Sequence, residues 1–245
     1  MRNKPILLLI AFLLLSAFIS ERPGVTIFMI GDSTMANKDT TGGNPERGWA
    51  MMLPECFGKE VCIDNHAMNG RSSKSFIDEG RWDKVIARVK KGDYVFIQFG
   101  HNDEKEDPKR HTDPGTTFDD NLRRFVNETR VKGGIPVLFN SIVRRNFVGD
   151  TLHDTHGAYL ESPRSVAREL GVTFIDMNRI THNLVQGLGP EESKKLFMWV
   201  APNTVAAMPG GREDNTHLNV YGGRQVARLA ADAIVEAVPA LAKYR

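Results

Sequence analysis

Four short motifs in the chain carry residues that could transfer an acyl group, and the first of them is Gly31-Asp32-Ser33-Thr34. It directly follows Val25–Ile30, a short apolar run of the kind that forms buried strands. In open α/β sheets, reactive groups gather at the carboxyl ends of the strands. A serine at that position, ahead of a predicted helix, presents its hydroxyl and its backbone N–H to the same place. Ser33 is therefore the predicted nucleophile, although Gly-Asp-Ser is also an ordinary turn sequence.

The second and third motifs offer hydrogen-bond donors for a developing oxyanion. Asn69-Gly70-Arg71-Ser72-Ser73 follows the second predicted strand, and its glycine lets the backbone N–H approach a ligand closely. Gly100-His101-Asn102-Asp103 follows the third, and the Asn102 amide can donate to an oxyanion. A plain turn at Gly70 and a cap or Asx-turn at Asn102 remain alternatives. His101 is more typical of a hydrogen-bonded structural histidine than of a base.

The fourth motif, Asp214-Asn215-Thr216-His217, supplies a candidate base and its partner. A spacing of three residues in a turn lets the carboxylate accept a hydrogen bond from one imidazole nitrogen, which leaves the other free to take a proton from a serine. Asp150 and His153 have the same spacing and form a rival pair.

Metal chemistry is a weaker hypothesis for this chain. His153, Asp154 and His156 could pass for metal ligands, but they lie in a long predicted loop with no helix to set the spacing of ligands. No further carboxylate or cysteine pattern supports them. We therefore expect no catalytic metal.

Taken together, the motifs resemble the four blocks of the SGNH (GDSL-like) hydrolase family, in the family's order, between about Thr26 and Leu229. The resemblance implies that Ser33 is the nucleophile, His217 the base and Asp214 its orienting carboxylate. It also implies an oxyanion hole made by the N–H groups of Ser33 and Gly70 and the side chain of Asn102. Because the family's base lies near the C-terminus, the resemblance favours His217 over His153 as the base. No cofactor is expected, since the chemistry needs only proton transfer and charge stabilisation.

Within that family the chain looks most like the rhamnogalacturonan acetylesterase branch. The residues that carry this likeness are Gly31-Asp32-Ser33-Thr34-Met35, Glu46-Arg47-Gly48-Trp49, Gly70-Arg71-Ser72-Ser73-Lys74-Ser75-Phe76 and Phe99-Gly100-His101-Asn102-Asp103. Many family members have leucine after the serine, whereas this chain has Thr34, and the rhamnogalacturonan acetylesterase branch also has threonine there. The implied substrate is an acetylated pectic polysaccharide or oligosaccharide.

Strand-like and helix-like segments alternate along the chain, which predicts a mostly parallel sheet with helices on both faces. With the family resemblance, the expected fold is a three-layer α/β/α, flavodoxin-like SGNH hydrolase with five strands in one domain, residues 21–245. The predicted strands are Val25–Ile30, Val61–Asn65, Tyr94–Phe99, Pro136–Asn140 and Val172–Asp176. The predicted helices are Gly48–Phe57, Arg81–Lys90, Thr117–Lys132, Tyr159–Leu170 and a last helix that Pro239 ends. Three long irregular stretches, at 100–115, 141–157 and 200–219, are expected on one rim of the sheet.

The N-terminal residues indicate export. Arg2 and Lys4 precede Ile6–Ile19, an uncharged apolar stretch that matches a signal peptide over residues 1–20, although an uncleaved anchor stays open. The protein is thus expected to be periplasmic or secreted, without stable membrane association after the signal is removed. In an oxidising compartment Cys56 and Cys62 could pair, and the sequence leaves this open.

Composition narrows the classes of function. The 245 residues are 41% hydrophobic and 25% charged, with a formal net charge of +2, which fits a folded domain. No basic stripe is interleaved with aromatics, so nucleic acid is not an expected partner. The predicted function is removal of acetyl groups from a pectic polysaccharide. Alternatives are an esterase acting on acetylated xylan or on a lipid, and a glycan-binding protein without catalysis.

Electrostatics adds one argument for an anionic substrate. Four basic residues lie in segments expected to border the rim, and arginines suit the carboxylates of galacturonate. They are Arg71, Lys74, Arg144 and Arg145.

Overall fold

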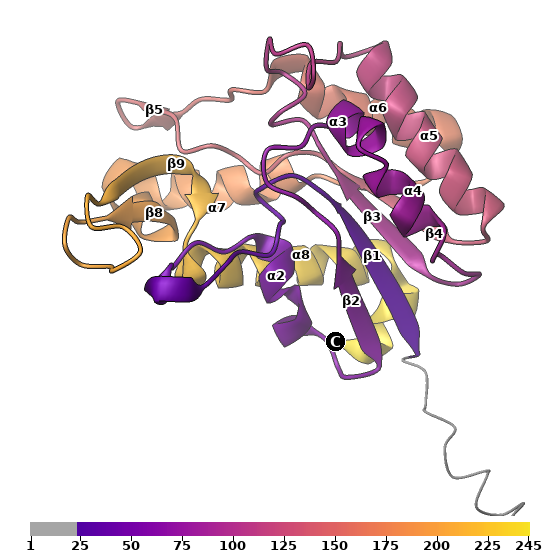
Figure 1. The fold of residues 1–245 in the computed structure, drawn as a ribbon, viewed down its shortest axis with the longest axis horizontal. Helices are drawn as coiled ribbons and strands as arrows, with labels where there is room; N and C mark the ends of the chain where they lie inside the picture. Colours follow the sequence, from indigo (N-terminus) through magenta and orange to yellow (C-terminus); the bar gives the residue numbers. More distant parts are fainter. Residues whose placement is uncertain (1–23) are drawn as a thin grey trace, which may run out of the picture.

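The computed structural model describes residues 24–245, which are built around a five-stranded parallel sheet (Figure 1). The strand order is β2-β1-β3-β4-β7, and each neighbouring pair is parallel. The strands are β1 (Val25–Gly31), β2 (Val61–Asn65), β3 (Tyr94–Gln98), β4 (Ile135–Phe139) and β7 (Thr173–Ile175). All five carboxyl ends therefore lie at one edge of the sheet. The predicted signal segment, residues 1–20, lies outside the described residues.

Each face of the sheet is covered by helices, as the alternation of side chains along β1 illustrates. Ile27 and Met29 belong to one buried cluster, while Phe28 and Ile30 belong to the other, because successive strand residues point to opposite faces. Figure 1 shows the two helical layers. The first cluster includes residues of α2 (Trp49–Met52), α7 (Met177–Glu192) and α8 (Val220–Ala237). The second includes residues of α3 (Ser73–Asp78), α4 (Arg81–Ile86), α5 (Thr117–Val131) and α6 (Glu161–Leu170). The predicted three-layer fold is confirmed.

The N-terminal half departs from the sequence prediction at the helix expected after Ser33. The residues after Ser33 form only a turn, closed by hydrogen bonds from the N–H groups of Met35 and Ala36 to the carbonyl of Asp32. The helix predicted at Gly48–Phe57 is split into α2 and a 3-10 turn, η3 (Leu53–Cys56), which has Pro54 in its first turn. Because proline cannot donate a backbone hydrogen bond, the α-helix ends before it.

Three regular segments were missed in the C-terminal half. Helix α7 begins at Asp176, whose carboxylate accepts a hydrogen bond from the Arg179 N–H. The stretch predicted to be irregular, 200–219, contains most of an antiparallel hairpin of β8 (Phe197–Val200) and β9 (Arg212–Leu218). Polar residues dominate β9, so its sequence lacks the apolar alternation by which strands are recognised. A second small hairpin, β5 (Phe147–Val148) and β6 (Thr151–Leu152), lies in the predicted loop 141–157.

The structure also bears on the cysteines and on membrane crossing. Cys56 and Cys62 are both free thiols. Over residues 24–245, no helix combines the length and the apolar character needed to cross a bilayer. The single-domain organisation of residues 21–245 stays a prediction.

Gly31 at the end of β1 is predicted to be intolerant of any side chain. A Cβ placed there would lie 2.6 Å from the Gln98 carbonyl oxygen of β3 and 2.6 Å from the Met35 sulfur. The neighbouring backbone cannot move without breaking the β1–β3 pairing. Gly31→Ala should lower the free energy of unfolding by about 2–3 kcal/mol, measured by urea denaturation.

Gly187 provides the matched control, because it is exposed in α7 and nothing lies within 4 Å of a Cβ built on it. Gly187→Ala should leave stability unchanged or raise it by up to about 1 kcal/mol. Equal midpoints for the two variants would contradict the close packing assigned to Gly31.

Candidate active site

Ser33, His217 and Asp214 form a continuous line of hydrogen bonds at the carboxyl edge of the sheet. Nε2 of His217 lies 2.9 Å from Oγ of Ser33. Nδ1 of the same imidazole lies 2.7 Å from Oδ2 of Asp214. Since Nδ1 must carry a proton to donate to a carboxylate, Nε2 is left as an acceptor for the serine hydroxyl. The sequence prediction thus named the three residues that the fold brings together.

The Asp214–His217 spacing works because β9 bulges at this point. Met198 of β8 pairs with Asp214 and Phe197 with Leu218, so three residues of β9 stand out from the ladder. The other carboxylate oxygen of Asp214 accepts hydrogen bonds from the N–H groups of Thr216 at 2.7 Å and His217 at 2.9 Å. These bonds fold the bulge back over the carboxylate and aim the imidazole at Ser33. Alone, burial would raise the pKa of Asp214, but the hydrogen bonds from the side chain and backbone of His217 outweigh it and lower the pKa.

A buried polar chain fixes the turn that carries Ser33. Oδ1 of Asp32 accepts hydrogen bonds from both the N–H and the hydroxyl of Thr34, each at 2.8 Å. The Thr34 hydroxyl accepts in turn from the side-chain amide of Gln98 in β3, and the amide oxygen Oε1 of Gln98 accepts from the Trp49 indole N–H. The four side chains are at most 1% exposed, so the turn is tied to β3 and α2 within the core. Burial raises the pKa of Asp32.

The two other candidate oxyanion donors, Gly70 and Asn102, are held together by contacts of the loop after β2. The Met68 N–H donates to the Gly31 carbonyl, which carries the β1–β2 pairing past the end of both strands. Gly70 follows with φ at +73°, a left-handed conformation that favours glycine. One N–H of the Asn102 amide donates to the Arg71 carbonyl at 3.1 Å and ties the two loops together. Between residues 24 and 245, no protein acceptor takes the N–H of Ser33 or of Gly70, so both are available to a ligand.

Asp103 anchors the same two loops from beneath. Its carboxylate accepts hydrogen bonds from the Ser73 N–H and hydroxyl, the Thr112 hydroxyl and the Gly100 N–H. Burial raises the pKa of Asp103 to about 7 against the effect of these bonds. The sequence placed Asp103 in a motif but gave it no role. Its contacts show that it holds the start of α3 against the Asn102 loop.

The remaining histidines of the sequence analysis do not approach Ser33. His101 is buried, with Nδ1 at 2.9 Å from Nε2 of His156, and burial holds its pKa well below the usual range. His101 is therefore structural, as its position suggested. His153 is exposed and has no side-chain hydrogen bond to Asp150 or Ser33, so the rival pair is not assembled. Among the described residues there is no cluster of three or more histidine, cysteine or carboxylate side chains arranged for a metal.

Of the four basic residues expected at the rim, three are ion-paired and the fourth is buried, which corrects the electrostatic argument for an anionic substrate. Arg71 pairs with Glu79, and Lys74 with Asp78. Arg144 pairs with Glu104, and Arg145 is only 8% exposed. Its guanidinium donates to Asn215, to Ser193 and to the carbonyl of Pro190. Arg145 thus supports the β9 bulge from within rather than facing a substrate.

Three charged residues to which sequence reasoning assigned no role lie beside the line of hydrogen bonds, namely Lys38, Glu46 and Arg212, although Glu46 belongs to one of the motifs that carry the likeness. Arg212 pairs with Asp214, and also with Glu46 at 2.6 Å. Glu46 pairs with Lys38 at 2.7 Å. Arg212 and Asp214 are two residues apart on a strand and so share a face, which is the signal that could have found this pairing.

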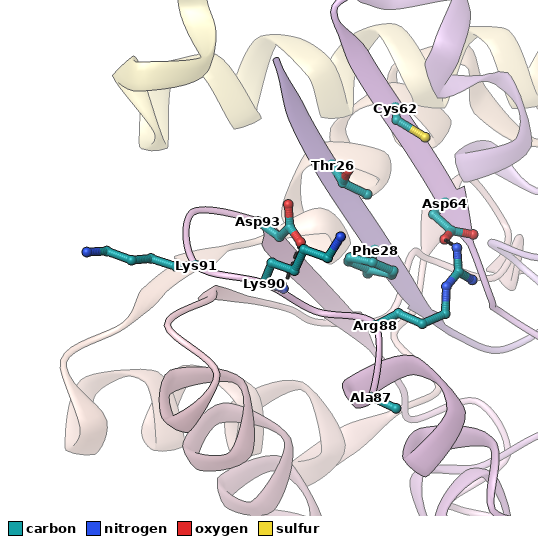
Figure 2. A pocket seen from close by; sticks show the side chains of 9 residues that line it. All are labelled: Thr26, Phe28, Cys62, Asp64, Ala87, Arg88, Lys90, Lys91 and Asp93. Carbon is teal, nitrogen blue, oxygen red and sulfur yellow. Dashed lines mark hydrogen bonds and ion pairs between the residues drawn. The ribbon is translucent and has the colours of Figure 1, made fainter. Parts of the chain in front are cut away.

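A cavity of about 680 Å³ lies away from these side chains (Figure 2). Its walls come from β1 and β2 and from the segment between α4 and β3. Arg88, which lines it, is paired with Asp64 at 2.6 Å and lies over the Phe28 ring (Figure 2). None of the four motifs contributes to this cavity, so the chemistry is not located there.

Comparisons with known proteins agree with the fold and the motifs. The model of the GDSL-like lipase/acylhydrolase family matches residues 29–225. The rhamnogalacturonan acetylesterase RhgT of Bacillus subtilis is 39% identical over 213 residues, which cover 86% of this chain and 90% of that protein. A rhamnogalacturonan acetylesterase of Emericella nidulans is 28% identical, with 87% of this chain and 84% of that one covered.

Among solved structures, the protein YXIM of Bacillus subtilis superposes with a TM-score of 0.75 at 27% identity over 88% of this chain, although the match spans only 57% of that protein. An acetylxylan esterase from Geobacillus stearothermophilus, at 19% identity and a TM-score of 0.58, covers 87% of this chain and 93% of its own and shares the fold. With the family model matched over most of its length and a close relative aligned along nearly all of both sequences, the chain belongs to the GDSL-like lipase/acylhydrolase family.

Proposed function

We propose that the protein is a serine esterase that removes acetyl groups from a pectic polysaccharide of the rhamnogalacturonan type. The observation that carries the chemistry is the hydrogen bond between Nε2 of His217 and Oγ of Ser33, with Asp214 on the other imidazole nitrogen. The substrate class rests on two relatives that are named rhamnogalacturonan acetylesterases and aligned over most of their length.

The proposed reaction has two halves. Ser33 Oγ attacks the acetyl carbonyl while His217 takes the hydroxyl proton, and the carbonyl electrons move onto the oxygen. The N–H groups of Ser33 and Gly70 and the amide of Asn102 bind this oxyanion. Collapse of the intermediate expels the sugar alkoxide, which receives the proton from His217. Water then attacks the acetyl-serine by the same route, releasing acetate and restoring the hydroxyl.

Two other functions are weaker. An acetylated xylan is the substrate of a structural neighbour whose identity is too low to carry more than the fold. A glycan-binding protein without catalysis has no need of a serine hydrogen-bonded to an oriented imidazole. We also propose that the protein is exported, on the strength of the apolar segment at its N-terminus.

Ser33→Ala should abolish turnover and preserve the fold, because the change removes one oxygen from a turn fixed by its neighbours. His217→Ala should cost as much, and the double variant little more, since the two groups act as a unit. The expected loss in kcat is about a thousandfold or more, measured with p-nitrophenyl acetate. His153→Ala, which alters an exposed histidine, is the matched control and should keep full activity. Activity in a folded Ser33→Ala variant would refute the mechanism.

Asn102→Ala should lower kcat by about a hundredfold to a thousandfold and leave KM nearly unchanged, as expected for a donor that acts on the oxyanion. Steady-state kinetics on an acetyl ester provide the measurement. A change confined to KM would instead make Asn102 a substrate-binding residue or a structural cap.

Acetate release should be fastest on acetylated rhamnogalacturonan, slower on acetylated xylan, and should fall for p-nitrophenyl esters beyond about four acyl carbons. Because the basic side chains near the rim are paired, salt should affect kcat/KM only weakly. Equal rates on the two polysaccharides would remove the pectic assignment. A rate that climbs with acyl length would indicate a lipase, since each buried methylene adds about 0.8 kcal/mol.

A further inference from the structure

We propose that Arg212 is a positioning residue that holds the carboxylate of Asp214 and, together with Glu46 and Lys38, sets the charge felt by the His217 imidazole. The inference rests on the proposed function, because it assigns a role beside the same three side chains.

The four charged side chains form one alternating chain of ion pairs, Lys38–Glu46–Arg212–Asp214. Lys38 Nζ lies 2.7 Å from Oε1 of Glu46, and Arg212 Nη1 lies 2.6 Å from Oε2 of the same carboxylate. The other terminal nitrogen of Arg212 pairs with Oδ2 of Asp214. The side chain of Lys38 is only 3% exposed and that of Glu46 12%, so the chain leads from the interior to the catalytic carboxylate. Buried charges of this kind persist only when they are paired.

Two donors meet at one oxygen of Asp214. Oδ2 accepts from Nδ1 of His217 at 2.7 Å and from Nη2 of Arg212, while Oδ1 is taken by the two backbone N–H groups of the bulge. Nη2 of Arg212 also lies 3.2 Å from Nδ1 of His217. Both nitrogens carry protons in this arrangement, so the contact is not an attraction. It places a permanent positive charge beside the ring that must itself become positive during the reaction.

The field at the imidazole is therefore a balance of several fixed charges. Asp214 and Arg212 act from its own strand, Asp32 from the turn after β1, and Glu46 from the segment before α2. His101 faces the imidazole from the turn after β3, but burial holds its pKa well below the usual range, so it adds no charge. Lys38 faces both Asp32 and Glu46. Arg212 opposes a positive imidazole, and Glu46 weakens that opposition by neutralising Arg212.

The shifts in the pKa values of Lys38 and Glu46 agree with this arrangement of ion pairs. For Lys38, burial lowers the pKa, although Glu46 opposes the change. Burial would raise the pKa of Glu46, but the hydrogen bond from Lys38 and the pairing with Arg212 leave it lowered. Glu46 is thus an anion that holds Arg212 in place.

Neutral replacements of Arg212 and of Glu46 should shift the acidic limb of the profile of kcat/KM against pH in opposite directions. In Arg212→Gln the imidazole loses the nearby cation and takes up a proton more readily, so the limb should move up by roughly one pH unit. In Glu46→Gln the cation is no longer neutralised, so the limb should move down by roughly half a unit. Arg212→Gln should also reduce kcat roughly tenfold with KM unchanged, because Oδ2 loses one of its two donors.

The experiment is to record kcat/KM for p-nitrophenyl acetate against pH for the wild type and both variants. Arg212→Lys should return the limb to its wild-type position and restore kcat only in part, since lysine keeps the charge but cannot bridge two carboxylates. Arg123→Gln is the matched control. Arg123 of α5 is ion-paired with Glu169 of α6, in the helical layer that contains the second cluster. Thermal unfolding checks that each variant is folded.

Opposite shifts of the two variants, with the control unmoved, would support the inference. A limb that stays in place in folded Arg212→Gln and Glu46→Gln would overturn it, even if kcat fell, since a purely structural role moves no limb. Should Arg212→Gln fail to fold, the limb of Glu46→Gln decides: a downward shift supports the inference, and an unmoved limb overturns it. Failure of the proposed function itself is seen separately, as activity retained by Ser33→Ala.

Discussion

The candidate active site depends on one hydrogen bond between distant parts of the chain, from Oγ of Ser33 to Nε2 of His217, 184 residues later. Its two ends are carried by different sheets, since Ser33 follows β1 of the parallel sheet and His217 lies in β9 of a separate hairpin. Neither element alone can orient the pair. The rest of the site is best understood as the set of contacts that keep these two segments in register.

Those contacts are mostly buried and polar. Asp32 and Thr34 bind the Ser33 turn to Gln98, Asp103 binds the Gly70 and Asn102 loops together, and Arg145 supports the β9 bulge through Asn215. Burying a polar group costs free energy unless it is hydrogen-bonded, so these bonds favour the one arrangement in which they are all made. We infer that the site is positioned before substrate arrives, as electrostatic catalysis requires.

The parallel sheet and the residues at its edge could be predicted from the sequence because each depends on local signals. Val25–Ile30 and Tyr94–Phe99 are apolar runs, and each ends in a motif with glycine and polar residues. Strand β9 was missed because its residues are polar and its ladder is interrupted by the Asp214–His217 bulge. The role expected for Arg145 was also wrong, since sequence shows a charge but not its partner. Finding Asn215 beside it requires the three-dimensional fold.

The central claim is that Ser33 is a nucleophile activated by His217, and covalent trapping tests it most directly. The protein would be treated with a serine-directed phosphonate probe, and the labelled peptide located by mass spectrometry. The account predicts one adduct, on Ser33, whose formation slows severely in folded His217→Ala and is unchanged in His153→Ala. An adduct on another serine, or labelling of Ser33 at an undiminished rate without His217, would contradict it.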